Sequence, residues 1–398
     1  MKLVKKIYTF ITAAACCAAI SGIMPFSSSA EESVKTYGDL SYVSSDSDGD
    51  RIYDYIAIID CNESVTKIEI PAEIEDIPVV EIESSAFNGC ANLTSIIIPD
   101  SITSIGDFAF ENCSGLTSIT IPDSVTSIGD HAFYNCSSLT SITVSENNKY
   151  FSSLNGVLFN KDKTELITYP IGNERTEYTI PDSVTSIGNF AFYNCSSLTS
   201  ITIPDSVASI GNSAFYNCSS LTNIKLPDVI DIISGNTFRD CSSLLNIIIP
   251  DSVTAIKECA FYNCSNLTSI TIPDSVASIE NSAFYNCTSL KSITLNNPDC
   301  EISNDKDTIP ETAVICGYEN STAQAYAERY YKRFVAIEDI GDISGNGKID
   351  LYDAIEIAKA IMGMRTFTEE EKLIADFNKD VTVDLYDAIE IARTLLPK

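Results

Sequence analysis

Apolar positions recur every 23 residues through most of this 398-residue chain. The unit is plainest at 116–138, LTSITIPDSVTSIGDHAFYNCSS, and it begins again at Leu198, Leu221, Leu244 and Leu267. A cysteine holds one place in each unit, at Cys90, Cys113, Cys136, Cys195, Cys218, Cys241, Cys264 and Cys287. A fixed period of this length predicts stacked coils, in which each unit buries its apolar face against its neighbours.

Each unit predicts a strand that ends at a turn. Leu116, Ile119 and Ile121 face inward while the intervening polar residues face outward, as a half-buried strand requires. Pro122 and Asp123 then end the strand. Single coils cannot bury this face alone, so about ten stacked coils predict a β-rich solenoid with a continuous core and an extended curved surface.

The repeat divides the chain into predicted regions. Repeats occupy 65–295, between an N-terminal cap at 31–64 and a C-terminal cap and linker at 296–340, which includes a short helix near 321–331. One interval, from Cys136 to Cys195, is two repeats plus 13 residues long. The extra material near 146–175 predicts a β-hairpin insertion whose turn is Asn155-Gly156.

The order of conserved residue types within the unit, leucine, isoleucine, proline, isoleucine, Ala-Phe and cysteine, resembles the BspA-like leucine-rich repeat family. The resemblance covers about 65–295. It implies a leucine-rich-repeat solenoid that serves adhesion or recognition of a protein.

The cysteine ladder leaves two states open. Stacked Cα atoms at strand spacing fall within disulfide range. Side chains of a parallel stack point the same way, however, and cysteine is a suitable small buried residue. Free thiols are therefore the preferred prediction, and zinc binding is disfavoured because a line of single cysteines does not surround a point.

The end of the chain repeats the octapeptide LYDAIEIA, at 351–358 and 385–392. Oxygen-bearing side chains precede each copy at alternate positions, with the spacing of a twelve-residue calcium loop, and helical apolar spacing follows each loop. The first predicted Ca²⁺ site comprises Asp342, Ser344, Asn346, Lys348 through its carbonyl, Asp350 and Asp353. The second comprises Asp376, Asn378, Asp380, Thr382 through its carbonyl, Asp384 and Asp387. Val381 stands where a glycine is usual, so the second turn is the less regular one.

Two loop-helix units in tandem, over 341–398, resemble the type I dockerin of cellulosomal proteins. The resemblance implies a small all-α module that holds two Ca²⁺ ions and binds the cohesin module of a scaffolding protein. The implied cohesin contacts are Leu351, Tyr352 and Lys359, and Leu385, Tyr386 and Arg393. Because the two sets nearly match, the resemblance also implies binding in two orientations related by a half turn.

Charge and the first residues restrict partner and compartment. With 25 basic and 55 acidic residues, the net charge of −30 argues against nucleic acid as a partner. Three lysines precede an apolar run at 7–26, and the small residues Ser28 and Ala30 follow it, so 1–30 is a predicted secretory signal peptide. No second long apolar run appears, so a soluble extracellular protein is expected, attached to a cell-surface or free cellulosome without membrane insertion after cleavage.

Catalytic residues are not predicted. His131 is the only histidine, at a repeat position that Phe108, Phe190 and Ser213 occupy elsewhere. The aspartates that recur after the proline suit turn residues better than a functional acidic stripe. Paired acids across a cleft, as glycoside hydrolysis needs, are not evident.

One row of residues is a possible ligand surface. It follows the buried phenylalanine and comprises Tyr134, Tyr193, Tyr216, Tyr262 and Tyr285. Such a row could stack on sugars or anchor a protein, or each ring could pack along the next coil.

These features predict a secreted, non-catalytic binding or adhesion protein, whose repeat surface recognises an extracellular protein or surface ligand and whose dockerin attaches it to a cellulosome. Two alternatives stay open: a component of plant polysaccharide degradation, by carbohydrate binding or an unrecognised glycoside hydrolase activity, and a structural spacer.

Overall fold

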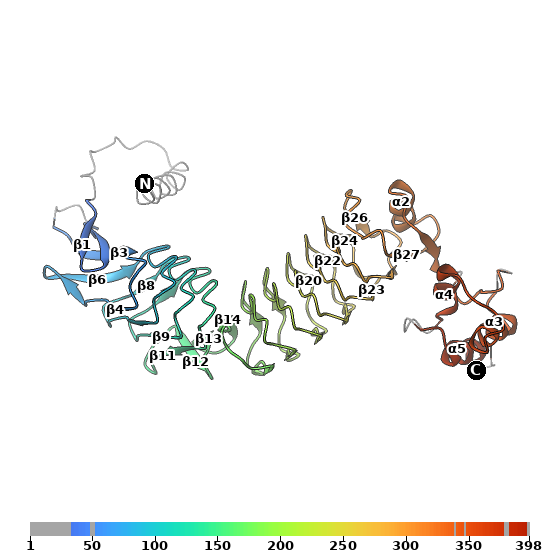
Figure 1. Cartoon of the computed structure of the whole chain (residues 1–398), viewed down its shortest axis with the longest axis horizontal. Helices are drawn as coiled ribbons and strands as arrows, with labels where there is room; N and C mark the ends of the chain where they lie inside the picture. Colours follow the sequence, from blue (N-terminus) through green and yellow to red (C-terminus); the bar gives the residue numbers. More distant parts are fainter. Residues whose placement is uncertain (1–32, 48–51, 338–339, 346–347, 378–381, 396–398) are drawn as a thin grey trace.

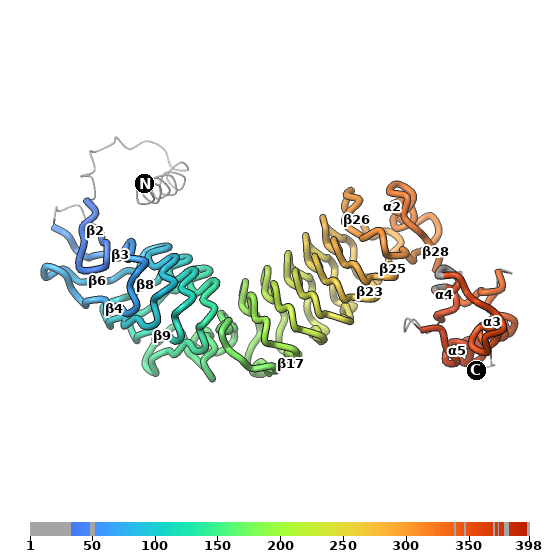
Figure 2. The backbone as a smooth tube through the Cα atoms, viewed as in Figure 1, coloured from blue at the N-terminus to red at the C-terminus, as the bar shows by residue number. Residues whose placement is uncertain are grey.

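A computed structural model describes residues 33–47, 52–337, 340–345, 348–377 and 382–395. The chain forms an elongated stack of coils that leads from the N-terminal strands to α2 (Thr322–Arg329), and three further helices follow it (Figure 1). Figure 2 shows successive coils lying side by side, which is the predicted solenoid.

Two rows of short strands run along the stack, and strands within a row pair in parallel. One row contains β4 (Lys67–Glu69), β7 (Ser95–Ile97), β9 (Ser118–Ile121), β11 (Ser141–Val144), β15 (Glu177–Thr179), β17 (Ser200–Thr202), β19 (Asn223–Lys225), β21 (Asn246–Ile248), β23 (Ser269–Ile272), β25 (Ser292–Leu295), β27 (Val314–Gly317) and β28 (Phe334–Ala336). The other row contains β6 (Ile77–Ile82), β8 (Ser104–Ile105), β10 (Ser127–Ile128), β14 (Glu165–Thr168), β16 (Ser186–Ile187), β18 (Ser209–Ile210), β20 (Ile232–Ile233), β22 (Ala255–Ile256), β24 (Ser278–Ile279) and β26 (Glu301–Ile302). Residues 23 apart face each other, for example Ser141 and Ser118, so the sequence period equals one coil.

Strands at both ends lengthen the stack. At the N-terminal end, β1 (Lys35–Tyr37), β2 (Leu40–Ser45) and β3 (Tyr55–Cys61) pair antiparallel, and β5 (Glu73–Ile74) pairs with β6. β3 also pairs in parallel with β6, and β27 pairs in parallel with β28. The solenoid has about twelve turns rather than the expected ten, because these end segments adopt the parallel pairing of the coils.

An antiparallel pair interrupts the stack. β12 (Phe151–Leu154) and β13 (Val157–Asn160) meet through a turn at Asn155 and Gly156, whose φ angles of 53° and 85° are left-handed. β13 pairs antiparallel with β14, which rejoins the parallel row at β16. The buried residues form one apolar cluster on each side of this insertion.

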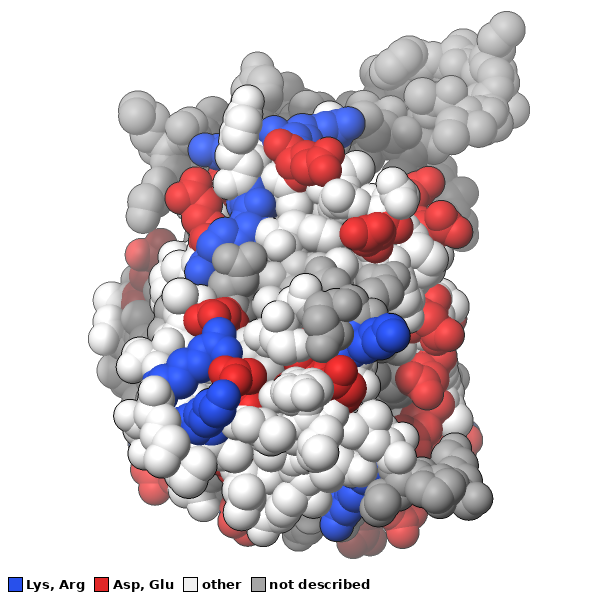
Figure 3. All heavy atoms as spheres, turned by 90° about the vertical axis from the view of Figure 1, so that its right-hand side faces the viewer, with Lys and Arg blue, Asp and Glu red and all other residues white. Residues whose placement is uncertain are grey.

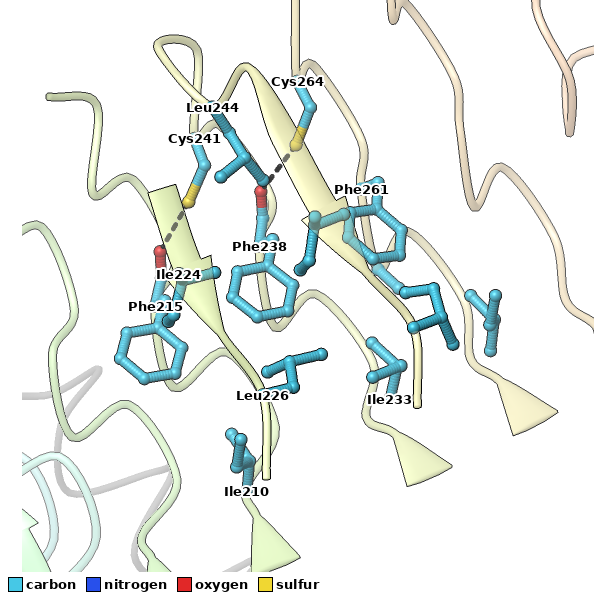
Figure 4. Packing of buried hydrophobic residues seen from close by; sticks show 14 of the residues in the cluster. Ile210, Phe215, Ile224, Leu226, Ile233, Phe238, Cys241, Leu244, Phe261 and Cys264 are labelled. Carbon is cyan, nitrogen blue, oxygen red and sulfur yellow. Dashed lines mark hydrogen bonds between the residues drawn. The ribbon is translucent and has the colours of Figure 1, made fainter. Parts of the chain in front are cut away.

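Two ladders run through the core. One buried phenylalanine of each outer turn stacks on its counterparts, with ring centroids 5.2 to 5.7 Å apart. Cysteine thiols donate to phenylalanine carbonyls of the preceding coil, as Cys241 does to Phe215 and Cys264 to Phe238, both at 3.1 Å (Figure 4). All twelve cysteines of the described residues are free thiols, so hydrogen bonding to carbonyls is the state of the ladder.

We expect these thiols to be unreactive in the folded protein. Burial raises the pKa of Cys136, Cys218 and Cys287 to about 12, so little thiolate exists at neutral pH. Fewer than about one in ten of the ladder thiols should react with a disulfide reagent at pH 8, against nearly all in denaturant. The thiols ionise near pH 9.0 in the unfolded chain and at higher pH in the folded protein. The free energy of unfolding should therefore fall as pH rises above 9. Rapid labelling of the native protein would contradict this expectation.

The C-terminal module packs three helices around a small core. Ile357 of α3 (Leu351–Ile361) and Ile391 of α5 (Leu385–Thr394) are fully buried in it. α4 (Glu369–Ala375) lies between them in sequence, and it was not predicted. Thr368 and Glu371 form its capping box, a T-x-x-E pattern that was available in the sequence. The module also contacts the solenoid end, because Ile374 packs against the cluster of Val314, Cys316 and Val335.

Candidate functional site

The first acidic loop folds its ends together. The Asp353 carboxylate is fully buried and accepts hydrogen bonds from the backbone N–H of Ser344 at 2.9 Å and of Asp350 at 2.6 Å. The Ser344 hydroxyl donates to the Asp342 carboxylate at 3.2 Å. Loop positions 1, 3 and 12 therefore meet, although ten residues lie between Asp342 and Asp353.

The second loop repeats the helix start. Asp384 accepts from the Tyr386 N–H at 2.7 Å, while the buried Asp387 accepts from the Asp384 N–H at 2.9 Å. In the first unit, Asp350 accepts from Tyr352 at the same 2.7 Å. Asp376 ends α4, and Thr382 is exposed.

The donor set of the first loop fits a hard cation. Ca²⁺ prefers carboxylate, hydroxyl and carbonyl oxygens, and Asp342, Ser344 and Asp353 supply such oxygens at one place. Three predicted ligands, Asn346, Asn378 and Asp380, lie outside the described residues, as does Val381. Within the described part of the chain, no group of three or more His, Cys, Asp or Glu side chains is arranged for a metal. Lys348 and Thr382 are described, and their predicted role is through the backbone carbonyl.

Matching apolar residues are exposed on the two duplicated helices. Leu351 and Tyr352 at the start of α3 are 59% and 69% exposed, and Leu385 and Tyr386 at the start of α5 are 59% and 66% exposed. Such exposure of adjacent large apolar side chains is typical of an interaction surface. Lysine and arginine side chains occur among acidic ones at this end of the molecule (Figure 3).

The two predicted basic contacts are also exposed, and each pairs with a glutamate three residues earlier. Lys359 lies 2.6 Å from Glu356, and Arg393 pairs with Glu390. The two helices therefore present equivalent basic side chains paired with a glutamate, although Glu356 also pairs with Arg365.

The tyrosines of the solenoid row stack on one another in two groups. Tyr134 and Tyr193 have centroids 4.3 Å apart with hydroxyls in contact at 2.5 Å, and Tyr193 to Tyr216 is 5.2 Å. Tyr262 and Tyr285 lie 4.8 Å apart. All but Tyr285 are half-buried, so each ring packs on a neighbour while its edge faces solvent.

Arg239 is a member of this row that the sequence analysis missed. Its guanidinium lies 5.5 Å from the ring centre of Tyr216 and 4.3 Å from that of Tyr262, with Nε 3.6 Å from the Asp240 carboxylate. The row is thus unbroken from Tyr193 to Tyr285. The 23-residue period places Arg239 at the tyrosine position, and this was the available signal.

We expect the triple change Tyr193→Ser, Tyr216→Ser and Tyr262→Ser to destabilise the solenoid. Half-buried stacked rings lose packing when truncated, by about 1 kcal/mol or more each. Thermal melting measures this loss, and the same changes to phenylalanine, which keep the rings, are the control. An unchanged melting temperature would instead identify the rings as surface groups free to bind a ligand.

His131 lies among aromatic rings rather than catalytic partners. Its ring stacks on Phe108 at 4.8 Å and lies 4.0 Å from Phe190. All three residues have φ between 55° and 59°, which identifies a conserved left-handed position of the outer turn. This setting provides no hydroxyl or thiol nucleophile hydrogen-bonded to the imidazole within the described residues.

The geometry defines a class of protein: a repeat solenoid joined to a paired-loop helical module, both suited to binding other proteins. The chain belongs to the BspA type leucine rich repeat region family, whose model matches six copies over 59–175 and 171–291. A Dockerin type I domain matches 340–396. Both families are non-catalytic. Together they make a protein-interaction architecture in which the dockerin implies a cohesin partner.

The chain is similar to several solved structures, and one of them, PcpA, shows the fold. The pneumococcal vaccine antigen PcpA is 20% identical, with 77% of this chain and 98% of that chain covered and a TM-score of 0.55. A leucine rich cell surface protein from Faecalibacterium prausnitzii is 25% identical over 72% of this chain and 97% of that chain, with a TM-score of 0.48. A leucine-rich repeat protein from Eubacterium ventriosum is 23% identical over 70% and 93%, with a TM-score of 0.45. No curated protein matches the chain.

The described helices include none that is both long and apolar enough to cross a bilayer. The predicted signal peptide at 1–30 lies outside the described residues.

Proposed function

We propose that this is a secreted, non-catalytic binding protein that a calcium-dependent dockerin attaches to a cohesin-bearing scaffold of the cellulosome type. The observation that carries the proposal is the paired exposure of Leu351-Tyr352 and Leu385-Tyr386, each beside a buried aspartate of its acidic loop. The proposal includes a signal peptide at 1–30, an N-terminal cap at 31–64, repeats at 65–295, a C-terminal cap and linker at 296–340 and a dockerin at 341–398.

Two Ca²⁺ ions would be held by the loop oxygens. The first would use Asp342, Ser344 and Asp353, already in contact through hydrogen bonds, with Asn346, Asp350 and the carbonyl of Lys348. The second would use the matching residues Asp376, Asn378, Asp380, Thr382, Asp384 and Asp387. Bound Ca²⁺ would neutralise carboxylates that fold close together and so hold the helix starts in place.

The solenoid would display the ligand surface. Its outer tyrosine and arginine row presents aromatic edges and one cation along several coils, which suits recognition of an extracellular protein or surface ligand. Polysaccharide binding is a weaker candidate, because the chain contains no tryptophan.

Capture on immobilised cohesins tests the proposal. The full mature chain, in calcium, should bind at least one member of a panel of type I cohesins, while the same chain without residues 340–396 should not. In parallel, the cohesin-bound protein should retain an extracellular protein or surface ligand from a mixture of host proteins, bacterial surface proteins and plant polymers. Failure to bind every cohesin of the panel would refute the attachment.

A further inference from the structure

A regular set of hydrogen bonds links the outer turns of neighbouring coils. At six junctions, three backbone N–H groups at alternate positions of one turn donate to three carbonyls of the following turn. The coil of Phe110 is typical, with bonds from Phe108 to Asp130 at 3.0 Å, from Phe110 to Ala132 at 2.8 Å and from Asn112 to Tyr134 at 2.9 Å. These bonds extend the sheet-like pairing of the coils to their outer edge.

One junction inside the stack lacks all three bonds. The N–H groups of His131, Phe133 and Asn135, which occupy the donor positions, have no acceptor among the described residues. The equivalent turn of the next coil is too short to reach them. Leu166 is in register with Ile187, and Tyr178 is in register with Ile201. Tyr178 follows Leu166 by 12 residues, whereas Ile201 follows Ile187 by 14.

The missing turn leaves a notch one coil wide. It has a volume of about 160 Å³, and its walls include His131, Tyr134, Tyr169, Phe190 and Tyr193. Tyr134 and His131 lean across it toward Tyr193 and Phe190 and partly close its outer side. Phe133 is 6% exposed here, whereas the other phenylalanines of the ladder are 0% exposed, so the notch opens to solvent.

Polar groups inside the notch lack partners. The Tyr169 hydroxyl, on a side chain 98% buried, and the His131 Nδ1 atom make no hydrogen bond. Burial raises the pKa of Tyr169 to about 12, while the exposed Arg175 opposes this without reaching hydrogen-bonding geometry. Buried polar groups are normally satisfied, so these two atoms can hydrogen-bond to a molecule that enters the notch.

The rim of the notch is acidic. In neighbouring coils the same position is satisfied: Asp107 accepts from the Asp130 N–H at 2.8 Å, and Asn189 accepts from the Asn212 N–H at 2.9 Å. No described residue donates to the Asp130 carboxylate, because the turn that would do so is missing. Glu165 supplies a second exposed carboxylate, and no lysine or arginine is among the residues that line the notch.

We propose that this notch binds an extended peptide segment of a protein partner and that the segment carries a basic side chain. Alternate carbonyls of the bound segment would accept from His131, Phe133 and Asn135, as those of the following turn do elsewhere, so its main chain would pair with the edge of the coil. The basic side chain would meet Asp130 and Glu165 beside the ring edges of Tyr134 and Tyr193. The inference deepens the proposed function, on which it rests, by naming partner chemistry for the solenoid.

The chain holds one such side chain in the same row. The guanidinium of Arg239 lies between the rings of Tyr216 and Tyr262 and beside the Asp240 carboxylate. Tyrosine faces with a carboxylate therefore accommodate a guanidinium on this scaffold. The notch offers tyrosine rings and carboxylates as well, and no lysine or arginine lines it.

The test uses the full mature chain and two synthetic peptides, acetyl-Thr-Arg-Thr-Arg-Thr-amide and the same peptide with neutral citrulline in place of arginine. Binding is measured by calorimetry and by hydrogen exchange of the backbone amides. We expect the arginine peptide to bind at least about tenfold more tightly than the citrulline peptide. It should slow exchange at His131, Phe133 and Asn135, which without peptide should exchange faster than Phe108, Phe110 and Asn112.

Two variants localise the binding. Asp130→Asn with Glu165→Gln should reduce affinity for the arginine peptide to about that for citrulline, and Asp274→Asn, an exposed turn acid of another coil, is the matched control. Replacing 167–177 with the thirteen residues of 188–200 supplies the missing turn and should abolish binding. Should this replacement fail to fold, the point variants and exchange data decide.

Absence of binding, equal binding of both peptides, or binding without protection of these three amides would overturn the inference. Persistent binding to the turn-replaced protein would do so too. Cohesin capture and retention of other ligands by the solenoid would be unaffected by that failure, so the proposed function is judged separately.

Discussion

Excess EDTA is expected to abolish cohesin capture and to reduce the helix content of the C-terminal module. Asp353 and Asp387 are fully buried and Asp342 is 9% exposed, so their charges are poorly hydrated without a cation. Several buried carboxylates without a counter-ion are strongly destabilising, and a small three-helix module has little apolar core to offset them. Circular dichroism and cohesin binding measure the two effects. EDTA already saturated with Ca²⁺ is the control, and full binding in excess free chelator would refute the calcium sites.

Substitution isolates the first loop. Asp353→Asn keeps the side-chain shape and one acceptor oxygen but removes the charge, so Ca²⁺ affinity should fall by tenfold or more, as loss of a charged ligand implies. Glu390→Gln removes a charge from the surface of α5 and should change Ca²⁺ affinity little. Equal effects of the two changes would show that general charge, rather than the loop, holds the ion.

The quadruple change of Leu351, Tyr352, Leu385 and Tyr386 to alanine is expected to weaken cohesin binding by at least about a hundredfold. Either pair alone should weaken it by about twofold. The two helices present the same residues at nearly equal exposure, so each offers one binding mode. Losing one of two equal modes halves the association constant, whereas losing both removes the apolar anchors.

Controls keep this test specific. Met362→Ala with Met364→Ala removes equally exposed apolar side chains, 62% and 73%, outside the predicted contact and should leave binding unchanged. Helix content should persist in every variant, because the replaced side chains face solvent. If one pair alone eliminates binding, the two-orientation hypothesis is wrong.

The local order of residues was sufficient to predict much of this protein. A 23-residue apolar period requires coils that bury one face, and residues 23 apart indeed pair across neighbouring strands. The duplicated LYDAIEIA segments predicted the two helices. The aspartate in the first turn of each helix forms a capping box with the N-cap residue, Asp350 or Asp384. These features depend on neighbours in sequence or on a strict repeat, so the sequence carries them directly.

Other features depended on contacts between distant segments. The unpredicted α4 has a capping pattern of its own, but its position against Val314 and Val335 follows from the end of the solenoid. The extra turns arise because cap strands add to an existing parallel edge. The tyrosines pack on one another and on Arg239. Their recurrence in the sequence does not distinguish packed rings from free surface rings.

By itself, then, the sequence determined the repeat, the strand and turn pattern, the acidic loops and the family resemblance, since each is a local preference repeated many times. Only the tertiary structure decided what the interruption does. A turn that is shorter by two residues is unremarkable in the sequence near Tyr169. In the stack, however, it removes three inter-coil hydrogen bonds and opens a notch between His131 and Phe190. The consequence appears there because coils satisfy one another's backbone groups, so a deletion in one coil changes the surface of the next.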